Sequence, residues 1–314
     1  MKKKNIITAL LFIAAVTANA QLIFRISGNG LEKPSYMLGS LHVLSGDLLD
    51  SIPAFLEAEK QCQQLFVEID VTNPQYKKDV QAAGQQLITL PDGMTISDVL
   101  GEERMNVLQE RMKESCHINL ADSAAKDNLR FQPVFFTVIL DAMIQMEAFQ
   151  KYPAMRNGNM MDVACIIRAK DRGWKVGNLD QRHTSEELEK DKEALSQSID
   201  EQADSLMAML NNFDERRQKK LKELEGIQTM GDYWTAGDYE GFEQFIKSDN
   251  EANPAIYAER NKKWMPTIVE AIKEMPTLFV FGAGHLTGPD GIVRMLRDAG
   301  YKVDFVPLPP ICTR

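Results

Sequence analysis

YMLGSLH, at residues 36–42, and LFVFGAGH, at residues 278–285, repeat one local pattern near the two ends of the chain. Each begins with apolar residues that favour a β-strand, passes through a glycine, and places a histidine three residues after that glycine. Glycine allows the backbone to turn sharply and to approach a ligand closely. If both strands belong to one parallel sheet, His42 and His285 lie at its carboxyl edge, where open α/β sheets bind ligands.

The residues around the first stretch predict a strand, a helix and a second strand. Residues 21–27 are apolar and β-prone, and GNG at 28–30 is a hairpin signal that leads back into the strand at 36–38. Pro53 opens a helix that runs to about residue 63, and the mostly apolar residues 65–70 predict a buried strand. This strand–helix–strand order is typical of a parallel sheet.

The rest of the chain is mostly helical until strands return at its end. Apolar residues recur at helical spacing between residues 76 and 168, and a charged helical region at about 185–246 is broken around Gly231. Further elements are expected as a strand at 173–179, a helix at 254–274, a strand at 277–281, a helix from Pro289 to Ala299 and a strand at 302–306. We therefore predict an α/β fold for residues 21–314, a single domain. Its central mixed, largely parallel sheet comes from the N- and C-terminal segments, with a helical insertion at about 76–274.

The first twenty residues predict export. Lys2, Lys3 and Lys4 form a positive start, residues 6–16 are an apolar run, and ANA at 18–20 is a small-x-small cleavage site. The apolar run is shorter than the roughly 20 residues that a membrane span requires. We expect residues 1–20 to be a signal peptide whose removal leaves a periplasmic or secreted protein without a stable membrane insertion.

The charge of the chain argues against nucleic acid and anionic membrane surfaces as partners. The formal net charge is −9, and it becomes −12 when the three N-terminal lysines leave with the signal peptide. An acidic protein repels phosphate groups. A peptide or a small molecule is the partner that we expect.

The four cysteines, Cys62, Cys116, Cys165 and Cys312, are scattered and contain no C-x-x-C pair. A cysteine-rich zinc cluster is therefore not expected. Cys62 and Cys165 fall on predicted helices, where a cysteine usually behaves as a small buried apolar side chain.

Histidines and acids at strand ends are the candidates for chemistry. Imidazole is a metal ligand or a proton carrier near neutral pH, and His42 with His285 suits either use. His117 and His183 lack the strand-end setting and are expected at the surface. Glu68 and Asp70, two residues apart on a predicted strand, point to the same face. Such an acid could bind a metal, act as a general base, orient a histidine or pair with a neighbouring cation.

Several familiar catalytic and cofactor motifs are absent. The glycines at 282, 284 and 288 have neither the dinucleotide spacing nor the Gly-Lys-Ser/Thr ending of a nucleoside triphosphate loop. The chain also contains no G-x-S-x-G elbow and no H-E-x-x-H helix.

The chain resembles the TraB/GumN family, which includes the TIKI-type metalloproteases and is related to the erythromycin-esterase-like and ChaN-like proteins. The resemblance extends over essentially the whole mature chain. It is carried by YMLGSLH at 36–42, FVEID at 66–70, the W-x-x-G-D motif at 234–238, E-R-N-x-x-W at 259–264, FGAGHLTGPDG at 281–291, and Leu296, Gly300, Tyr301 and Val303.

The resemblance implies a role for each matching residue. It makes His42 and His285 the paired site histidines, Glu68 the site carboxylate, and Arg260 with Asn261 the polar partner set. Asp162 looks like the acid that follows a family glycine, and Gly39, Gly282 and Asp70 are expected to support the site. Relatives often have Leu-Glu-Thr where this chain has Leu-Asp-Gln at 179–181, so Asp180, with its shorter side chain, is not counted as a site residue.

The leading functional hypothesis is a divalent-metal-dependent hydrolase of TIKI-like type that cleaves amide bonds, with peptides as the expected substrates. His42 and His285 would hold or orient manganese, cobalt or zinc, since imidazole and carboxylate suit several first-row metals. Glu68 would ligate the metal or take a proton from its water. Arg260 would stabilise the developing oxyanion. Two alternatives remain: a metal-independent esterase-like hydrolase with a histidine base, and a non-catalytic protein that binds haem or a peptide.

Overall fold

The computed structural model describes residues 22–78, 89–151, 159–180, 197–252 and 254–306. The expected signal peptide at 1–20, His183 and Cys312 lie outside these residues. Within them, the structure is a mixed α/β fold, as the sequence predicted.

The fold is built on one six-stranded sheet with the order β4-β3-β5-β2-β1-β6. Its strands are β1 (Ile23–Ser27), β2 (Ser35–Ser40), β3 (Gln64–Val67), β4 (Lys175–Asn178), β5 (Thr277–Gly282) and β6 (Lys302–Phe305). Neighbouring strands from β4 to β2 are parallel, whereas β1 is antiparallel to both β2 and β6. The sheet is therefore largely parallel, and it joins strands from both ends of the chain.

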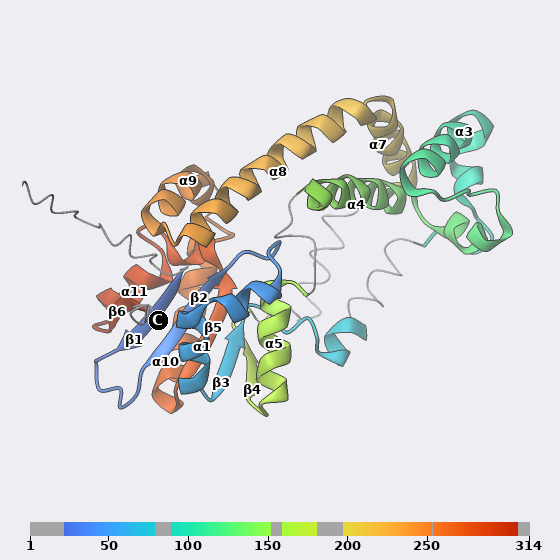
Figure 1. Ribbon diagram of the computed structural model, residues 1–314. Coiled ribbons are helices and arrows are strands. Elements are labelled where there is room, and N and C mark those ends of the chain that lie inside the picture. The colour runs from blue at the N-terminus through green and yellow to red at the C-terminus, as the bar shows by residue number, and fades with distance from the viewer. Residues whose placement is uncertain (1–21, 79–88, 152–158, 181–196, 253, 307–314) are drawn as a thin grey trace, which may run out of the picture.

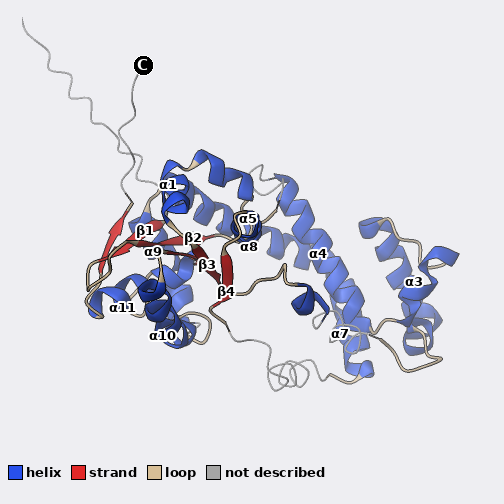
Figure 2. Ribbon diagram, turned by 90° about the horizontal axis from the view of Figure 1, so that it is seen from below, coloured by secondary structure: helices blue, strands red, loops and turns tan. Residues whose placement is uncertain are grey.

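Helices cover both faces of this sheet. The helical elements are η1 (Gly46–Ser51), α1 (Pro53–Gln61), α3 (Ile96–Cys116), η2 (Ser123–Arg130), α4 (Pro133–Lys151), α5 (Met161–Asp171), α7 (Ile199–Asn211), α8 (Phe213–Ala236), α9 (Tyr239–Ala252), α10 (Ala258–Glu274), η4 (Ala283–Leu286) and α11 (Ile292–Asp298). Figure 2 shows α1 and α5 on one side of the sheet and α10 and α11 on the other. Strands β2 and β3 are buried along their whole length, which explains the apolar runs at residues 36–38 and 65–67 within them.

A second group of helices has a hydrophobic core of its own. Helices α3, α4 and α7 pack around buried apolar side chains that are separate from the core of the sheet. Helix α8 connects the two cores, because Phe213 at its start belongs to the helical core and Trp234 near its end belongs to the sheet core (Figure 1). With 24 residues, it is about 36 Å long.

The predicted break around Gly231 was wrong. Helix α8 continues through Gly231 and ends at Gly237, whose φ of 67° is the left-handed conformation that favours glycine at a helix end. A helix tolerates an interior glycine, at a cost of about 1 kcal/mol relative to alanine, when packing on both sides holds it.

The described part of the chain contains no helix that is both long and apolar enough to cross a bilayer. Cys62, Cys116 and Cys165 are free thiols, and Cys62 and Cys165 are buried, as expected. Burial raises the pKa of the Cys116 thiol.

Candidate functional site

The two Gly-x-x-His turns lie side by side at the carboxyl edge of the sheet. Strands β2 and β5 are parallel neighbours, and their register pairs Ser40 with Gly282. Strand β3 borders β5 on its other side, where Val67 pairs with Val280. Glu68, the residue after Val67, therefore reaches the same edge as both turns.

Close packing explains the glycine in each turn. A Cβ atom on Gly39 would lie 2.4 Å from Leu286 Cδ1 and 3.1 Å from Ala283 Cα, so the second turn packs directly on the backbone of the first. A Cβ atom on Gly282 would lie 3.3 Å from Glu68 Oε1 and 3.6 Å from His42 Nε2. Gly282 thus forms the floor of the site.

His42 is oriented by an acid from the other side of the site. Its Nδ1 lies 2.6 Å from Asp162 Oδ2, and the hydroxyl of Ser40 donates to Asp162 Oδ1. The hydrogen bond with Asp162 raises the pKa of His42 to about 9. The His42 side chain is 58% exposed, so its ring borders the open side of the site.

His285 is buried and held in one tautomer. Asn261 donates from Nδ2 to the carbonyl oxygens of His285 and Asp290, which leaves Asn261 Oδ1 to accept from His285 Nδ1 at 2.7 Å. The ring also packs on Trp264, with 4.3 Å between the ring centroids. Burial lowers the pKa of His285 to about 4, so at neutral pH the ring is neutral and its Nε2 lone pair faces the site, where it accepts from Arg260 Nη1.

Glu68 connects the two histidines. Its Oε1 accepts from the Gly282 N–H at 2.7 Å and lies 3.9 Å from His42 Nε2 and 3.8 Å from His285 Nε2. Its Oε2 is bound by the guanidinium of Arg260. Burial alone would raise the pKa of Glu68. The positive charges of His285, which is protonated at acid pH, of Arg260 and of His42, together with the Gly282 N–H, outweigh burial, and the pKa is lowered.

Arg260 is held in place by Asp180, which the sequence did not identify as a site residue. Besides Glu68, its Nη2 binds Asp180 Oδ2 at 2.6 Å, and its Nη1 lies 3.3 Å from His285 Nε2. Asp180 is buried and also accepts from Trp264 Nε1 at 2.8 Å. The sequence signal that could have identified Asp180 is its position at a strand end, because it follows β4 as Glu68 follows β3. In the structure the N–H of Asp180 donates to the carbonyl of Glu68.

Asp70 and His117 lie apart from this group. Strand β3 ends at Val67, so the alternation of side chains does not extend to Asp70. Its carboxylate pairs with Lys170 at 2.7 Å and accepts from Thr72, which is the neighbouring-cation alternative raised above. His117 is exposed at the C-terminal end of α3.

Two cavities meet at the site residues. One of about 560 Å³ extends from the paired histidines under α8 and α9, and one of about 260 Å³ extends along α5 and the ends of β3 and β4. Both are lined by His42, Glu68 and Arg260. These three side chains thus stand where the cavities adjoin.

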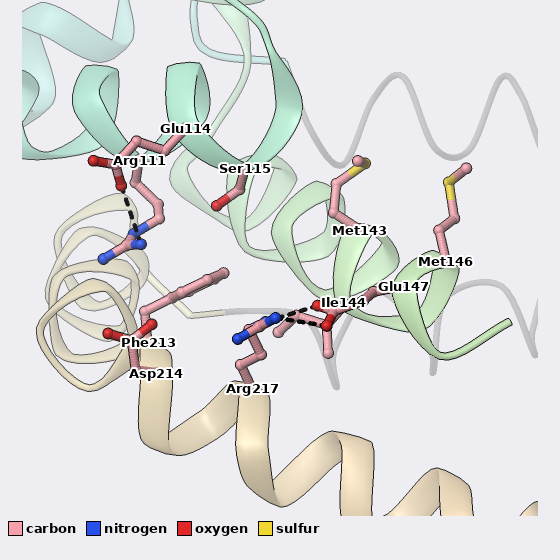
Figure 3. Close-up of a pocket in the computed structure, with 10 residues that line it drawn as sticks. All are labelled: Arg111, Glu114, Ser115, Met143, Ile144, Met146, Glu147, Phe213, Asp214 and Arg217. Atoms are coloured by element: carbon pink, nitrogen blue, oxygen red, sulfur yellow. Dashed lines mark hydrogen bonds and ion pairs between the residues drawn. The ribbon is translucent and has the colours of Figure 1, made fainter. Parts of the chain in front are cut away.

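A further pocket, of about 400 Å³, lies among the helices of the second core (Figure 3). Its charged side chains largely pair with each other: Arg111 with Glu114 at 3.2 Å, and Arg217 with Glu147 at 2.5 Å. It contains none of the residues at the sheet edge, and its paired charges leave it a weaker candidate for chemistry.

The donor set at the sheet edge fits a divalent metal in its chemistry. Across the described residues, no group of three or more His, Cys, Asp or Glu is arranged to hold a metal ion as it stands. Two ligands that each lie about 2.1 Å from one metal can be up to about 4.2 Å apart, and the separations of 3.8 and 3.9 Å at Glu68 Oε1 are within that limit. The Nδ1 hydrogen bonds of both rings are those that usually orient metal-ligating histidines.

Charge also favours a cation here. Three carboxylates meet two positive groups: Glu68 and Asp180 bind the guanidinium of Arg260, and Asp162 pairs with the protonated ring of His42, so the negative charges are in excess. Arg260 binds Glu68 through Oε2, which leaves Oε1 directed toward the histidines. Of the contacts of Arg260, only the one with His285 Nε2 has to open when a metal binds.

Comparison with known proteins agrees with the motifs at this site. The model of the TraB/PrgY/gumN family matches residues 22–304. Neither the curated proteins nor the solved structures contain a match to the chain. Since the family match includes every strand of the sheet and each site residue described above, the chain belongs to the TraB/PrgY/gumN family.

Proposed function

We propose that this protein is a hydrolase that cleaves amide bonds, with peptides as the expected substrates and a divalent metal as its cofactor. The observation that carries the proposal is the approach of His42 Nε2 and His285 Nε2 to a single oxygen of Glu68. Each ring is held from behind at Nδ1, by Asp162 and by Asn261. Such second hydrogen bonds fix both the tautomer and the direction of an imidazole ligand.

His42 and His285 would hold the metal, with Asp162 and Asn261 orienting the two rings, and Glu68, whose Oε1 faces both rings, would serve as the base. When bound, a divalent metal polarises the scissile carbonyl and makes water a stronger nucleophile at neutral pH. Manganese, cobalt and zinc all suit these ligands.

The protein's own groups supply the remaining steps. As the water oxygen bonds to the carbonyl carbon, Glu68 takes the proton of that water and passes it to the nitrogen as the C–N bond breaks. Arg260 stabilises the negative charge that develops on the carbonyl oxygen. Asp180 keeps the guanidinium in place through its bond to Nη2.

A metal-independent hydrolase is the second candidate, favoured by one specific observation. His285 is neutral, and its Nε2 lone pair, which accepts from Arg260 Nη1 at 3.3 Å, becomes available to a water molecule when that contact opens. In this version His285 takes the proton from water and the protonated His42 supplies one to the leaving group.

A peptide-library assay with and without chelator separates the two candidates. The metal proposal expects metal in the purified protein, loss of hydrolysis on chelation, and recovery on addition of Mn²⁺, Co²⁺ or Zn²⁺. Hydrolysis that survives full removal of metal would establish the metal-independent version.

His42→Ala and His285→Ala should each abolish hydrolysis while circular dichroism shows an intact fold. Binding of peptide or haem without turnover in the wild type would overturn both candidates.

We also infer that the protein is exported and acts in the periplasm or outside the cell. The positive start, apolar run and ANA cleavage site within residues 1–20 support this. Mass spectrometry of the protein from fractionated cells should find a mature N-terminus at Gln21, and an intact Met1 in the cytosolic fraction would contradict the inference.

A further inference from the structure

The larger cavity at the site is walled by apolar side chains. Apart from the site residues and the backbone of the two turns, it is lined mainly by Ile227, Met230, Phe242, Phe245, Ile246 and Ile256. Among the described residues of this lining, Glu223 is the one charged group beyond Glu68, His42 and Arg260. A volume of about 560 Å³ is within the usual range of about 300–1,000 Å³ for ligand pockets.

Two helices turn one apolar face each toward this cavity. Ile227 and Met230 are three residues apart on α8, and Phe242, Phe245 and Ile246 have the same helical spacing on α9. Phe245 is 40% exposed and Ile256 is 48% exposed. Large apolar side chains grouped at a cavity that adjoins catalytic residues indicate a ligand-binding surface.

The order of the strands places the two cavities on either side of the catalytic residues. The larger cavity is bounded by residues that follow β2 and β5, and the smaller one by residues that follow β3 and β4. A chain whose scissile bond lies at His42, Glu68 and Arg260 therefore extends into one cavity on each side. Aromatic side chains from α9 and Tyr257 line the larger cavity, whereas no aromatic residue in the described part of the chain lines the smaller one.

We propose that the cavity under α8 and α9 is a subsite for a large apolar side chain of the substrate, next to the bond that is cleaved. This inference rests on the proposed amide hydrolase and names its substrate class: peptides with a bulky apolar residue on one side of the scissile bond. An acidic side chain is disfavoured in the subsite, because its charge would lose water among the apolar side chains and face Glu223. The two cations of the lining, Arg260 and His42, are already paired with Glu68, Asp180 and Asp162.

Gly226 offers a way to fill the subsite without touching the catalytic residues. It lies in α8 and lines the cavity, and a Cβ atom built on it meets nothing nearer than Phe245 Cζ at 4.0 Å. Gly226→Phe therefore places a ring in the cavity, whereas Gly226→Ala adds one methyl group and serves as the matched control. Both changes also remove a glycine from the interior of a helix, which favours folding.

The test uses the peptides acetyl-Ala-Ala-Xaa-Ala-Ala-amide with Xaa as Phe, Leu, Ala or Asp. For the wild type, kcat/KM should be about 10–200-fold higher for Phe and Leu than for Ala, the usual range for filling an apolar pocket, and lowest for Asp. Gly226→Phe should remove the preference for Phe and Leu while the Ala peptide is still cleaved. Gly226→Ala should retain the preference. Equal rates for all four peptides, or an unchanged preference in Gly226→Phe, would overturn the subsite.

Calorimetric binding of the same peptides separates this inference from the proposed reaction. If no peptide is cleaved but Phe and Leu peptides bind to the wild type and not to Gly226→Phe, the subsite stands and the hydrolase falls. If all peptides are cleaved at equal rates, the hydrolase stands and the subsite falls. If the peptides show neither a cleavage preference nor selective binding, the subsite also falls. Met230→Ala, which only removes atoms, provides a second variant: it should improve cleavage or binding of a Trp peptide relative to the Leu peptide.

Discussion

The two Gly-x-x-His turns share a local sequence pattern, yet their histidines have opposite properties. His42 is 58% exposed, pairs with the carboxylate of Asp162 and has its pKa raised to about 9. His285 is 3% exposed, pairs with the amide of Asn261 and has its pKa lowered to about 4 by burial. The motif therefore sets where each ring lies, whereas burial and the partner of Nδ1 set its charge.

This asymmetry has a chemical use. At neutral pH the metal-free site holds a protonated His42 and a neutral His285 on the two sides of Glu68 Oε1. A metal that binds both rings has to displace the proton of His42, so metal affinity should increase with pH.

Of the variants that compare the two histidines, Glu68→Gln should have the largest effect on hydrolysis, because Glu68 Oε1 is the atom that both Nε2 atoms face. We expect kcat to fall about 10²–10⁴-fold, the usual loss when a positioned acid–base group is removed. Peptide hydrolysis under saturating substrate measures this effect. Asp70→Asn makes the same chemical change on a carboxylate that pairs with Lys170, and it should leave kcat unchanged. Equal losses in the two variants would show that Glu68 has no special role.

Asp162→Asn should remove much of the difference between the two rings. Without the carboxylate at Nδ1, the pKa of His42 should fall from about 9 toward its ordinary value of 6.5. NMR titration of the His42 ring in chelated protein measures this shift, with His42→Gln used to assign the signal. Loss of such a second hydrogen bond typically lowers metal affinity or activity about 10–100-fold. A pKa that stays near 9 would disprove the assigned role of Asp162.

The two glycines allow the turns to be compared in stability. Gly39→Ala forces a Cβ atom against Leu286 and the Ala283 backbone, and we expect the free energy of unfolding to fall by about 1–3 kcal/mol. Gly282→Ala brings its Cβ atom only to within 3.3 Å of Glu68 Oε1, so it should affect hydrolysis more than stability. Urea unfolding and peptide hydrolysis measure the two effects. A larger loss of stability in Gly282→Ala would contradict the packing described here.

A further prediction is a difference in how the two histidines affect stability with pH. The pKa of folded His285 is below its ordinary value, so its contribution is complete above pH 6.5 and is lost as pH falls toward 4. The pKa of folded His42 is above its ordinary value, so its contribution is complete below pH 6.5 and is lost as pH rises through 9. In chelated protein, His285→Gln should flatten the acid side of the stability profile and His42→Gln the alkaline side. Urea unfolding at successive pH values measures both profiles. If His285→Gln flattens the alkaline side instead, or His42→Gln the acid side, these assignments are wrong.

Asp70 and Asp180 mark the limit of prediction at the site. Alternation along a strand favoured Asp70, but alternation holds only while the backbone remains extended, and β3 ends three residues earlier. Asp180 was set aside for its short side chain, yet the approach of β4 to β3 and the position of α10 bring Arg260 within 2.6 Å of it. The reach of a side chain depends on how near the adjacent backbone lies, which no local pattern contains.

The sequence by itself determined the mixed α/β fold, the contribution of both chain ends to one sheet, and the positions of His42, His285 and Glu68 at strand ends. These follow from apolar periodicity and glycine positions, which act over a few residues. Only the tertiary structure decided which acid binds Arg260, which histidine is buried, and that α8 and α9 wall an apolar cavity beside both. Those features arise where segments far apart in the chain pack together, and burial and neighbouring charge there set the chemistry of each side chain.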